Sequence, residues 1–77
     1  MAVSDKIKAF LTLKGKNAAD LAKHLGISKQ ALSNKYYRDS FSAEDLIKIA
    51  DFLKIDLAFI IDNQKIILNI DDINISE

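Results

Sequence analysis

The polar side chains with the clearest chemistry lie in residues 28–35, which read Ser-Lys-Gln-Ala-Leu-Ser-Asn-Lys. Glutamine and asparagine amides can form two hydrogen bonds with adenine, and a lysine ammonium can donate to guanine O6 and N7. A serine hydroxyl can bond a base or a phosphate. At helical spacing these side chains share one face, and this candidate base-reading row consists of Lys29, Gln30, Ser33 and Asn34. The alternative for the same row is a solvated helix face that binds nothing.

The helix that carries this row has recognisable start signals. Ser28 is a strong N-cap residue, and Ile27 before it can pack on Leu32 as a hydrophobic staple that sets the angle of the incoming chain. Leu32 and Tyr36 are four residues apart, so they are predicted to point inward together, with Ala31 beside them. The candidate row is thereby turned outward.

A second helix is predicted immediately before this one. Asn17 is a strong N-cap, Asp20 suits the positive end of a helix, and Gly26 is predicted to end it. Its apolar stripe consists of Leu21, Ala22 and Leu25. Two short helices joined by a glycine-containing turn are typical of a helix-turn-helix, whose second helix enters the major groove of DNA.

Two further helices are predicted to flank this pair. Residues 4–13 carry apolar side chains at helical spacing, with Ser4 as the expected cap and Gly15 after the end. The last helix is predicted to begin after Ser42 with an acidic first turn and to end near Leu53. Together the four helices predict a mainly helical core.

The pattern changes after the last helix. Residues 57–61 and 66–70 are rich in β-branched and apolar side chains and flank residues 62–65, so a β-hairpin is predicted, with Asn63 taking the positive φ of a tight turn. Both faces of this hairpin are apolar. A two-stranded hairpin of this kind is not stable in water by itself, so we expect other surfaces to cover it.

The 77 residues are expected to form one domain, because no proline-rich or low-complexity linker interrupts them. Ile73 and Ile75 could extend a strand into the last residues. The predicted organisation is a helical core over 1–55, a hairpin over 56–70 and an acidic tail over 71–77.

Composition excludes several classes of protein. The sequence has no cysteine, so disulfides and thiolate metal sites are excluded, and a reducing compartment such as the cytoplasm is favoured. Its longest apolar run, residues 57–61, is too short to span a bilayer, and Asp5 and Lys6 argue against a signal peptide. His24, the single histidine, is expected to be solvated rather than metal-bound or catalytic.

The net charge of zero conceals two halves of opposite sign. Residues 1–40 contain eight basic and three acidic side chains, a net of +5, whereas residues 41–77 contain three basic and eight acidic, a net of −5. This asymmetry indicates that the first half faces a polyanion and the second half does not.

The stretch from Asn17 to Lys35, followed by Phe-Ser-Ala-Glu-Asp-Leu-Ile-Lys-Ile-Ala-Asp-Phe-Leu from Phe41, resembles the Xre/Cro (phage lambda repressor-like) helix-turn-helix family. The resemblance covers residues 4–55. It implies a lambda-repressor-like bundle of about four helices, to which this chain adds the C-terminal β-hairpin.

The resemblance also implies roles for individual residues. In the family, the residues just after the turn read bases. The matching residues here are Lys29, Gln30, Ser33 and Asn34. The residues that match the family's phosphate contacts are Asn17, at the start of the second helix, and Lys35, Tyr37 and Arg38, near the end of the third. Ala18 stands where the family often has a glutamine, so one phosphate contact of the family is not expected here.

These observations predict a sequence-specific regulator of transcription that binds double-stranded DNA. We expect a repressor from a bacterium or phage. Its expected location is the cytoplasm, in association with the nucleoid. One monomer reads half a site, so a homodimer on a pseudo-palindromic operator is expected. The hairpin is the expected dimerisation element, through Phe59, Ile61, Ile66, Leu68 and Ile70. We expect no enzyme activity, cofactor, metal, membrane or small-molecule ligand. The alternative is a protein-interaction module on the same fold, such as an antitoxin or a partner-binding regulator.

Overall fold

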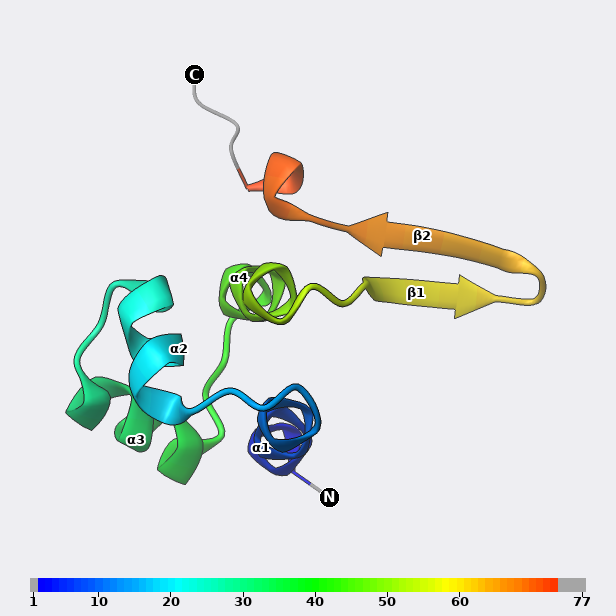
Figure 1. Cartoon of the computed structure of the whole chain (residues 1–77). Coiled ribbons are helices and arrows are strands. Elements are labelled where there is room, and N and C mark those ends of the chain that lie inside the picture. Colours follow the sequence, from blue (N-terminus) through cyan, green and yellow to red (C-terminus); the bar gives the residue numbers. More distant parts are fainter. Residues whose placement is uncertain (1, 74–77) are drawn as a thin grey trace.

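Four helices and a hairpin make up residues 2–73, the part of the chain that the computed structural model describes (Figure 1). This is the mainly helical fold that the sequence predicts. The elements in chain order are α1 (Val3–Leu13), α2 (Ala18–Leu25), α3 (Lys29–Arg38), α4 (Ala43–Leu53), β1 (Leu57–Ile61), β2 (Gln64–Leu68) and the 3-10 turn η1 (Ile70–Asp72).

Local polar caps set the boundaries of the helix-turn-helix. The Asn17 side chain accepts a 2.8 Å hydrogen bond from the backbone N–H of Asp20, and the Ser28 hydroxyl accepts one of 3.0 Å from Ala31. Gly26 ends α2 with φ at 74°, in the left-handed region where glycine has no Cβ penalty. The start of α2, the turn and the start of α3 are therefore where the sequence predicts them.

The start of α1 corrects a prediction. Ser4 does not cap the helix: the N-cap position is Ala2, which has no side-chain acceptor, and Ser4 is buried in the first turn. The acceptor comes from the distant end of α3, where Asp39 receives the backbone N–H groups of Val3 at 3.4 Å and Ser4 at 2.7 Å. The physical reason is that the Asp39 carboxylate, at the end of another helix, accepts the unpaired N–H groups of the first turn of α1.

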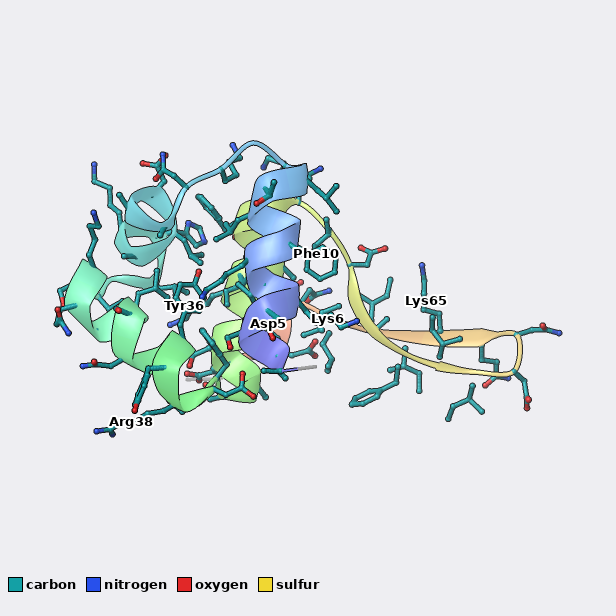
Figure 2. The ribbon with its side chains drawn as sticks, turned by 90° about the horizontal axis from the view of Figure 1, so that it is seen from below. Asp5, Lys6, Phe10, Tyr36, Arg38 and Lys65 are labelled. Carbon is teal, nitrogen blue, oxygen red and sulfur yellow. The ribbon has the colours of Figure 1, made fainter. Side chains whose placement is uncertain are left out.

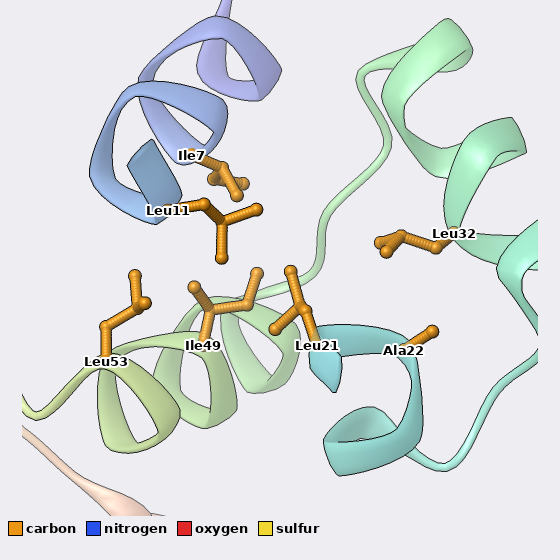
Figure 3. Close-up of a cluster of buried hydrophobic side chains, with 7 residues drawn as sticks. All are labelled: Ile7, Leu11, Leu21, Ala22, Leu32, Ile49 and Leu53. Carbon is orange, nitrogen blue, oxygen red and sulfur yellow. The ribbon is translucent and has the colours of Figure 1, made fainter. Parts of the chain in front are cut away.

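One apolar cluster joins all four helices (Figure 3). Leu21 on α2, Leu32 on α3 and Leu53 on α4 are its most completely buried side chains, with exposed fractions of 1% or less. The cluster consists of Ile7, Leu11, Leu21, Ala22, Leu32, Ile49 and Leu53. Burying one leucine contributes about 1.5–3 kcal/mol, so this cluster holds the helices in a fixed arrangement.

The hairpin forms with a shorter turn than the sequence predicts. The strands pair antiparallel with Leu57 opposite Leu68 and Ile61 opposite Gln64, which leaves only Asp62 and Asn63 in the loop. Asp62 takes the positive φ of 54°, whereas the sequence predicts it at Asn63. Two-residue loops match the twist of paired strands, which explains why pairing resumes at Gln64.

The second strand therefore ends two residues earlier than predicted. Ile70 is not in a strand but begins η1, whose N-cap Asn69 accepts a 2.9 Å hydrogen bond from Asp71. Ile73 follows this turn instead of extending a strand. The predicted extension at Ile75 lies outside the described residues.

The hairpin projects from the helical body, and its tip lies far from α2 and α3 in both views (Figures 1 and 2). The Cα radius of gyration is 12.9 Å. A compact chain of this length would have about 11.5 Å. In residues 2–73 no helix is both long and apolar enough to cross a membrane.

Candidate nucleic-acid interface

The candidate base-reading row lies together on the outer face of α3. Lys29, Gln30, Ser33 and Asn34 are all exposed, while Leu32 on the opposite face is 1% exposed and anchors the helix in the core. Gln30 Nε2 donates to Asn34 Oδ1 across one helical turn at 3.3 Å. This bond orients the two amide groups side by side on the outer surface.

The two ends of the helix-turn-helix carry further predicted contacts. Asn17 is exposed at the start of α2, and because its Oδ1 is used in the helix cap, its Nδ2 is the end that can donate to an anion. Tyr37 is 90% exposed near the end of α3, and Arg38 is exposed beside it (Figure 2). The structure thus presents these three side chains on the outer surface of α2 and α3.

Lys35 has a partner within the protein. Its Nζ lies 2.8 Å from Asp45 Oδ2 in the first turn of α4, and both side chains are partly buried. Asp45 is also part of a capping box, in which it accepts the Ser42 N–H at 3.0 Å and its own N–H donates to the Ser42 hydroxyl at 3.0 Å. The ion pair directs Lys35 toward α4, which sets it apart from the other predicted phosphate contacts.

The environment of Asp45 changes its acidity. Burial is the largest influence and raises the pKa, but the hydrogen bonds from Lys35 and from the Ser42 backbone outweigh it. The net result is a pKa below the ordinary value, so the carboxylate is charged when it pairs with Lys35. The spacing of Ser42 and Asp45 is the sequence signal from which the capping box could have been found.

Tyr36 points toward the inside of the protein from α3, as the sequence predicts. Its ring lies 5.8 Å from that of Phe41, and Lys8 Nζ stands 4.9 Å from its centroid on the α1 side. Burial raises the pKa of the hydroxyl, which has no hydrogen-bond partner in the described structure. Tyr36 therefore packs α3 against α1 and the start of α4.

Asp39 belongs to the site region although no sequence pattern predicts it. It follows α3 in the left-handed conformation, with φ at 53°, and its carboxylate is the acceptor at the start of α1. The backbone hydrogen bond from Ser4 holds the pKa of Asp39 below its ordinary value. The partners are 35 residues apart, so no local pattern signals this link.

His24 is exposed, as the sequence predicts, and it also contacts the neighbouring helix. Its Nε2 lies 3.5 Å from Asp51 Oδ2 on α4, and its ring lies 5.1 Å from that of Phe52. Within residues 2–73 no three His, Asp or Glu side chains are grouped closely enough to hold a metal ion. His24 thus adds a polar link between α2 and α4.

The dimensions of α3 suit a groove in nucleic acid. A helix with its side chains is about 10–12 Å across, and the major groove of B-DNA is about 12 Å wide. The row on α3 supplies both amide and ammonium donors on a rigid support, which is the chemistry of direct base recognition. Tyr37, Arg38 and Asn17 supply donors at the flanks, where the backbone of a bound duplex would pass.

Comparison with known families agrees with this arrangement. Residues 7–65, which include most of α1, the whole helix-turn-helix, α4 and the hairpin turn, match the bacteriophage CI repressor helix-turn-helix domain. No curated protein and no solved structure matches the chain. The family match covers more than half of the sequence, and the chain therefore belongs to the bacteriophage CI repressor helix-turn-helix family of DNA-binding transcription regulators.

Proposed function

We propose that this protein is a transcriptional repressor that binds a pseudo-palindromic operator in double-stranded DNA as a homodimer. The observation that carries the proposal is the exposed row on α3, held outward by a buried leucine within a helix-turn-helix. Repression of this kind needs no catalysis, because a protein on an operator excludes the polymerase. The proposed site of action is the cytoplasm, at the nucleoid.

The proposed contacts fall into two groups. Lys29, Gln30, Ser33 and Asn34 would read base edges, since amides and ammonium groups can discriminate among base pairs. The other group would bind phosphate, which adds affinity without sequence information, and consists of Asn17, Lys35, Tyr37 and Arg38. Lys35 would have to share its ammonium between Asp45 and a phosphate, because the two side chains are paired at 2.8 Å.

The proposed homodimer follows from the size of the site. One recognition helix reads only half of an operator, and two-fold dimers place two such helices about 34 Å apart. We propose that residues 1–77 act as one domain, in which the basic helical half meets DNA and the acidic half with the hairpin meets the second subunit. The net charges of +5 and −5 support this division.

The proposal can be tested by selecting bound sequences from a random pool of duplexes. We expect a pseudo-palindromic motif, with an affinity that falls steeply as salt rises. The matched control is the double variant Lys29→Ala and Gln30→Ala, which should bind weakly and without enrichment. If the wild-type chain enriches no motif and the double variant binds equally weakly, the DNA-binding proposal is wrong.

A second candidate function is a protein-interaction module, as in an antitoxin. The observation that favours it is the projecting hairpin, on which Phe59 and Ile60 are 65% and 72% exposed. The same selection distinguishes the two candidates, because a protein-interaction module enriches no operator.

A further inference from the structure

Both faces of the projecting hairpin are apolar, but only one of them carries an aromatic side chain. Alternation along the paired strands places one apolar set on one side, which we call the arm face: Leu57, Phe59, Ile61, Ile66 and Leu68. Only Gln64, at the tip, adds a polar side chain to it. The opposite face carries Ala58, Ile60 and Ile67, and also Lys65, whose Nζ lies 3.5 Å from Asp56 Oδ2. Ile60 on this face is 72% exposed, so both faces are open to solvent in the isolated chain.

The arm face is open in the isolated chain. Phe59 is 65% exposed, Ile61 62% and Ile66 59%. Contiguous apolar side chains on a projecting strand pair mark a contact surface, because an uncovered hairpin of two strands is not stable in water.

A hollow of matching character lies at the base of the arm. It has a volume of about 220 Å³ and is enclosed by α1, α4 and the start of β1. Among residues 2–73, Asp56 is the only charged side chain in its lining, and Phe10 lines it from the side of α1 that faces the hairpin (Figure 2). The apolar lining includes Ile7, Phe10, Leu46, Ala50, Ile55 and Leu57. Since an apolar cavity of about 150 Å³ accepts benzene, this α1–α4 hollow is large enough for a phenyl ring.

The arm and the hollow are adjacent, but the arm of one chain does not occupy the hollow of the same chain. Leu57 belongs to both the arm face and the hollow lining, whereas Phe59 lies outside the hollow, farther along a strand that runs away from the helices (Figure 1). A second copy carries the same arm. Under two-fold symmetry, if the arm of the first copy contacts the hollow of the second, the arm of the second copy also contacts the hollow of the first.

The chain exposes more surface than a compact monomer of its mass. The chain exposes 5657 Å². A compact monomer of the same mass exposes about 4,700 Å². The difference between these two areas is of the same order as the roughly 800 Å² that one partner buries in a standard interface.

We propose that two copies of the chain exchange arms, with Phe59 of each copy seated in the α1–α4 hollow of the other. This inference rests on the proposed homodimer and identifies its contact surface. The base-reading row lies on α3, at the opposite end of the molecule from the arm tip, so arm exchange leaves that row uncovered (Figures 1 and 2).

Cysteine cross-linking tests the arm exchange directly, because the natural sequence has no cysteine. Full-length Phe10→Cys and Phe59→Cys single variants are mixed and oxidised, and peptide mapping identifies which cysteines have joined. We expect a disulfide between the two different variants as the main product. The matched control is Ile60→Cys, on the opposite face of β1, which should not cross-link to Phe10→Cys.

A sedimentation experiment provides a second readout that does not depend on disulfide chemistry. The wild-type chain should sediment as a dimer, and Phe59→Asp and Phe10→Asp should each sediment at the monomer mass of 8.6 kDa. An equal mixture of the two variants should regain a dimer, because one intact arm can still enter one intact hollow. Circular dichroism checks that each variant is folded.

Other outcomes would overturn the inference. A predominant disulfide between two Phe59→Cys chains would mean that the hairpins pack face to face, and a monomeric wild-type chain would mean that the arm does not dock on a second copy. If the duplex selection yields a palindromic motif but Phe10→Cys and Phe59→Cys do not cross-link, the arm exchange is refuted and the DNA-binding proposal is not. An absence of any enriched motif would refute the DNA-binding proposal whatever the cross-linking result.

Discussion

At the scale of single residues, the row on α3 is separated from the residues that hold the fold. Its four side chains are exposed, whereas the neighbouring Leu32 is 1% exposed. Exposed substitutions usually change stability by less than about 0.5 kcal/mol. Binding and folding can therefore be changed independently at these positions.

Gln30→Ala is expected to remove one base contact without unfolding the protein. A good bidentate contact contributes about 1–3 kcal/mol of discrimination, so the preference for the correct base should fall by about 5- to 150-fold. Titration of the variant against the selected operator and its single-base variants measures this loss. Gln64→Ala, an exposed glutamine on the hairpin, is the control and should bind as the wild type does; an equal loss in both variants would contradict the assignment of Gln30.

Asp45→Asn is expected to destabilise α4 in a pH-dependent way. It weakens the capping box and removes the charge partner of Lys35, and loss of a cap costs about 1 kcal/mol. Because the pKa of Asp45 is lowered in the folded state, its stabilising contribution is present above the unfolded pKa of about 3.9 and is lost as the pH falls through the folded value.

Urea denaturation of both chains between pH 7 and pH 2 checks this prediction. The free energies of unfolding should differ at pH 7 and converge in acid. A constant difference across this range would show that the charge of Asp45 contributes nothing.

Residue patterns predict local features of this chain and miss distant ones. Asn17, Ser28 and Ser42 are confirmed as caps because each bonds a backbone group three residues ahead. The backbone N–H of Ser4 instead donates to the carboxylate of Asp39, and no pattern within one helix can indicate this bond. Local spacing likewise predicts the base-reading row; the structure confirms that the row is exposed, and its contacts with DNA stay predictions.

At the scale of elements, α3 is tied at its end to the start of α1. The link consists of the Asp39 carboxylate and the backbone N–H groups of Val3 and Ser4. Arg38 and Tyr37, two of the proposed phosphate contacts, directly precede it. We infer that the link positions the end of the recognition helix.

Asp39→Ala should therefore loosen α1 and weaken binding to the operator. Charge alone predicts the opposite sign, because removal of an acidic group near DNA strengthens association. A lower affinity would thus indicate positioning. Amide exchange at Ser4, measured by NMR, should accelerate in the variant.

Asp39→Asn is the conservative control, because asparagine tolerates the left-handed conformation and keeps an acceptor oxygen. It should retain more of the slow exchange at Ser4 than Asp39→Ala does. Operator binding that is tighter in Asp39→Ala would show that charge outweighs positioning.

Element types are more predictable here than element ends. The hairpin is confirmed, but β2 begins at Gln64 and ends at Leu68 because the loop contains two residues instead of four. Apolar residues on both faces leave the register unspecified by alternation, so the turn geometry decides it. Ile70 consequently lies in η1, outside the strand where the sequence places it.

At the scale of the whole molecule, all four helices share one core. A domain of this size has about 4–12 kcal/mol of stability, and replacing a buried leucine by alanine costs about 2–5 kcal/mol. Leu21→Ala should therefore remove a large part of the free energy of unfolding and melt all four helices together.

Chemical denaturation followed by circular dichroism measures the loss. Leu13→Ala is the matched control, because Leu13 is 78% exposed and should change stability little. Equal effects of the two substitutions would contradict the assignment of Leu21 to a core shared by the helices.

The central claim is that the row on α3 reads a DNA sequence. Its most direct test is the ratio of affinities for the selected operator and for a random duplex, measured at one salt concentration for the wild type and for the variant Lys29→Ala plus Gln30→Ala. We expect a large ratio for the wild type and a ratio near one for the variant, with both chains equally stable to urea. An unchanged ratio in the variant would contradict the claim.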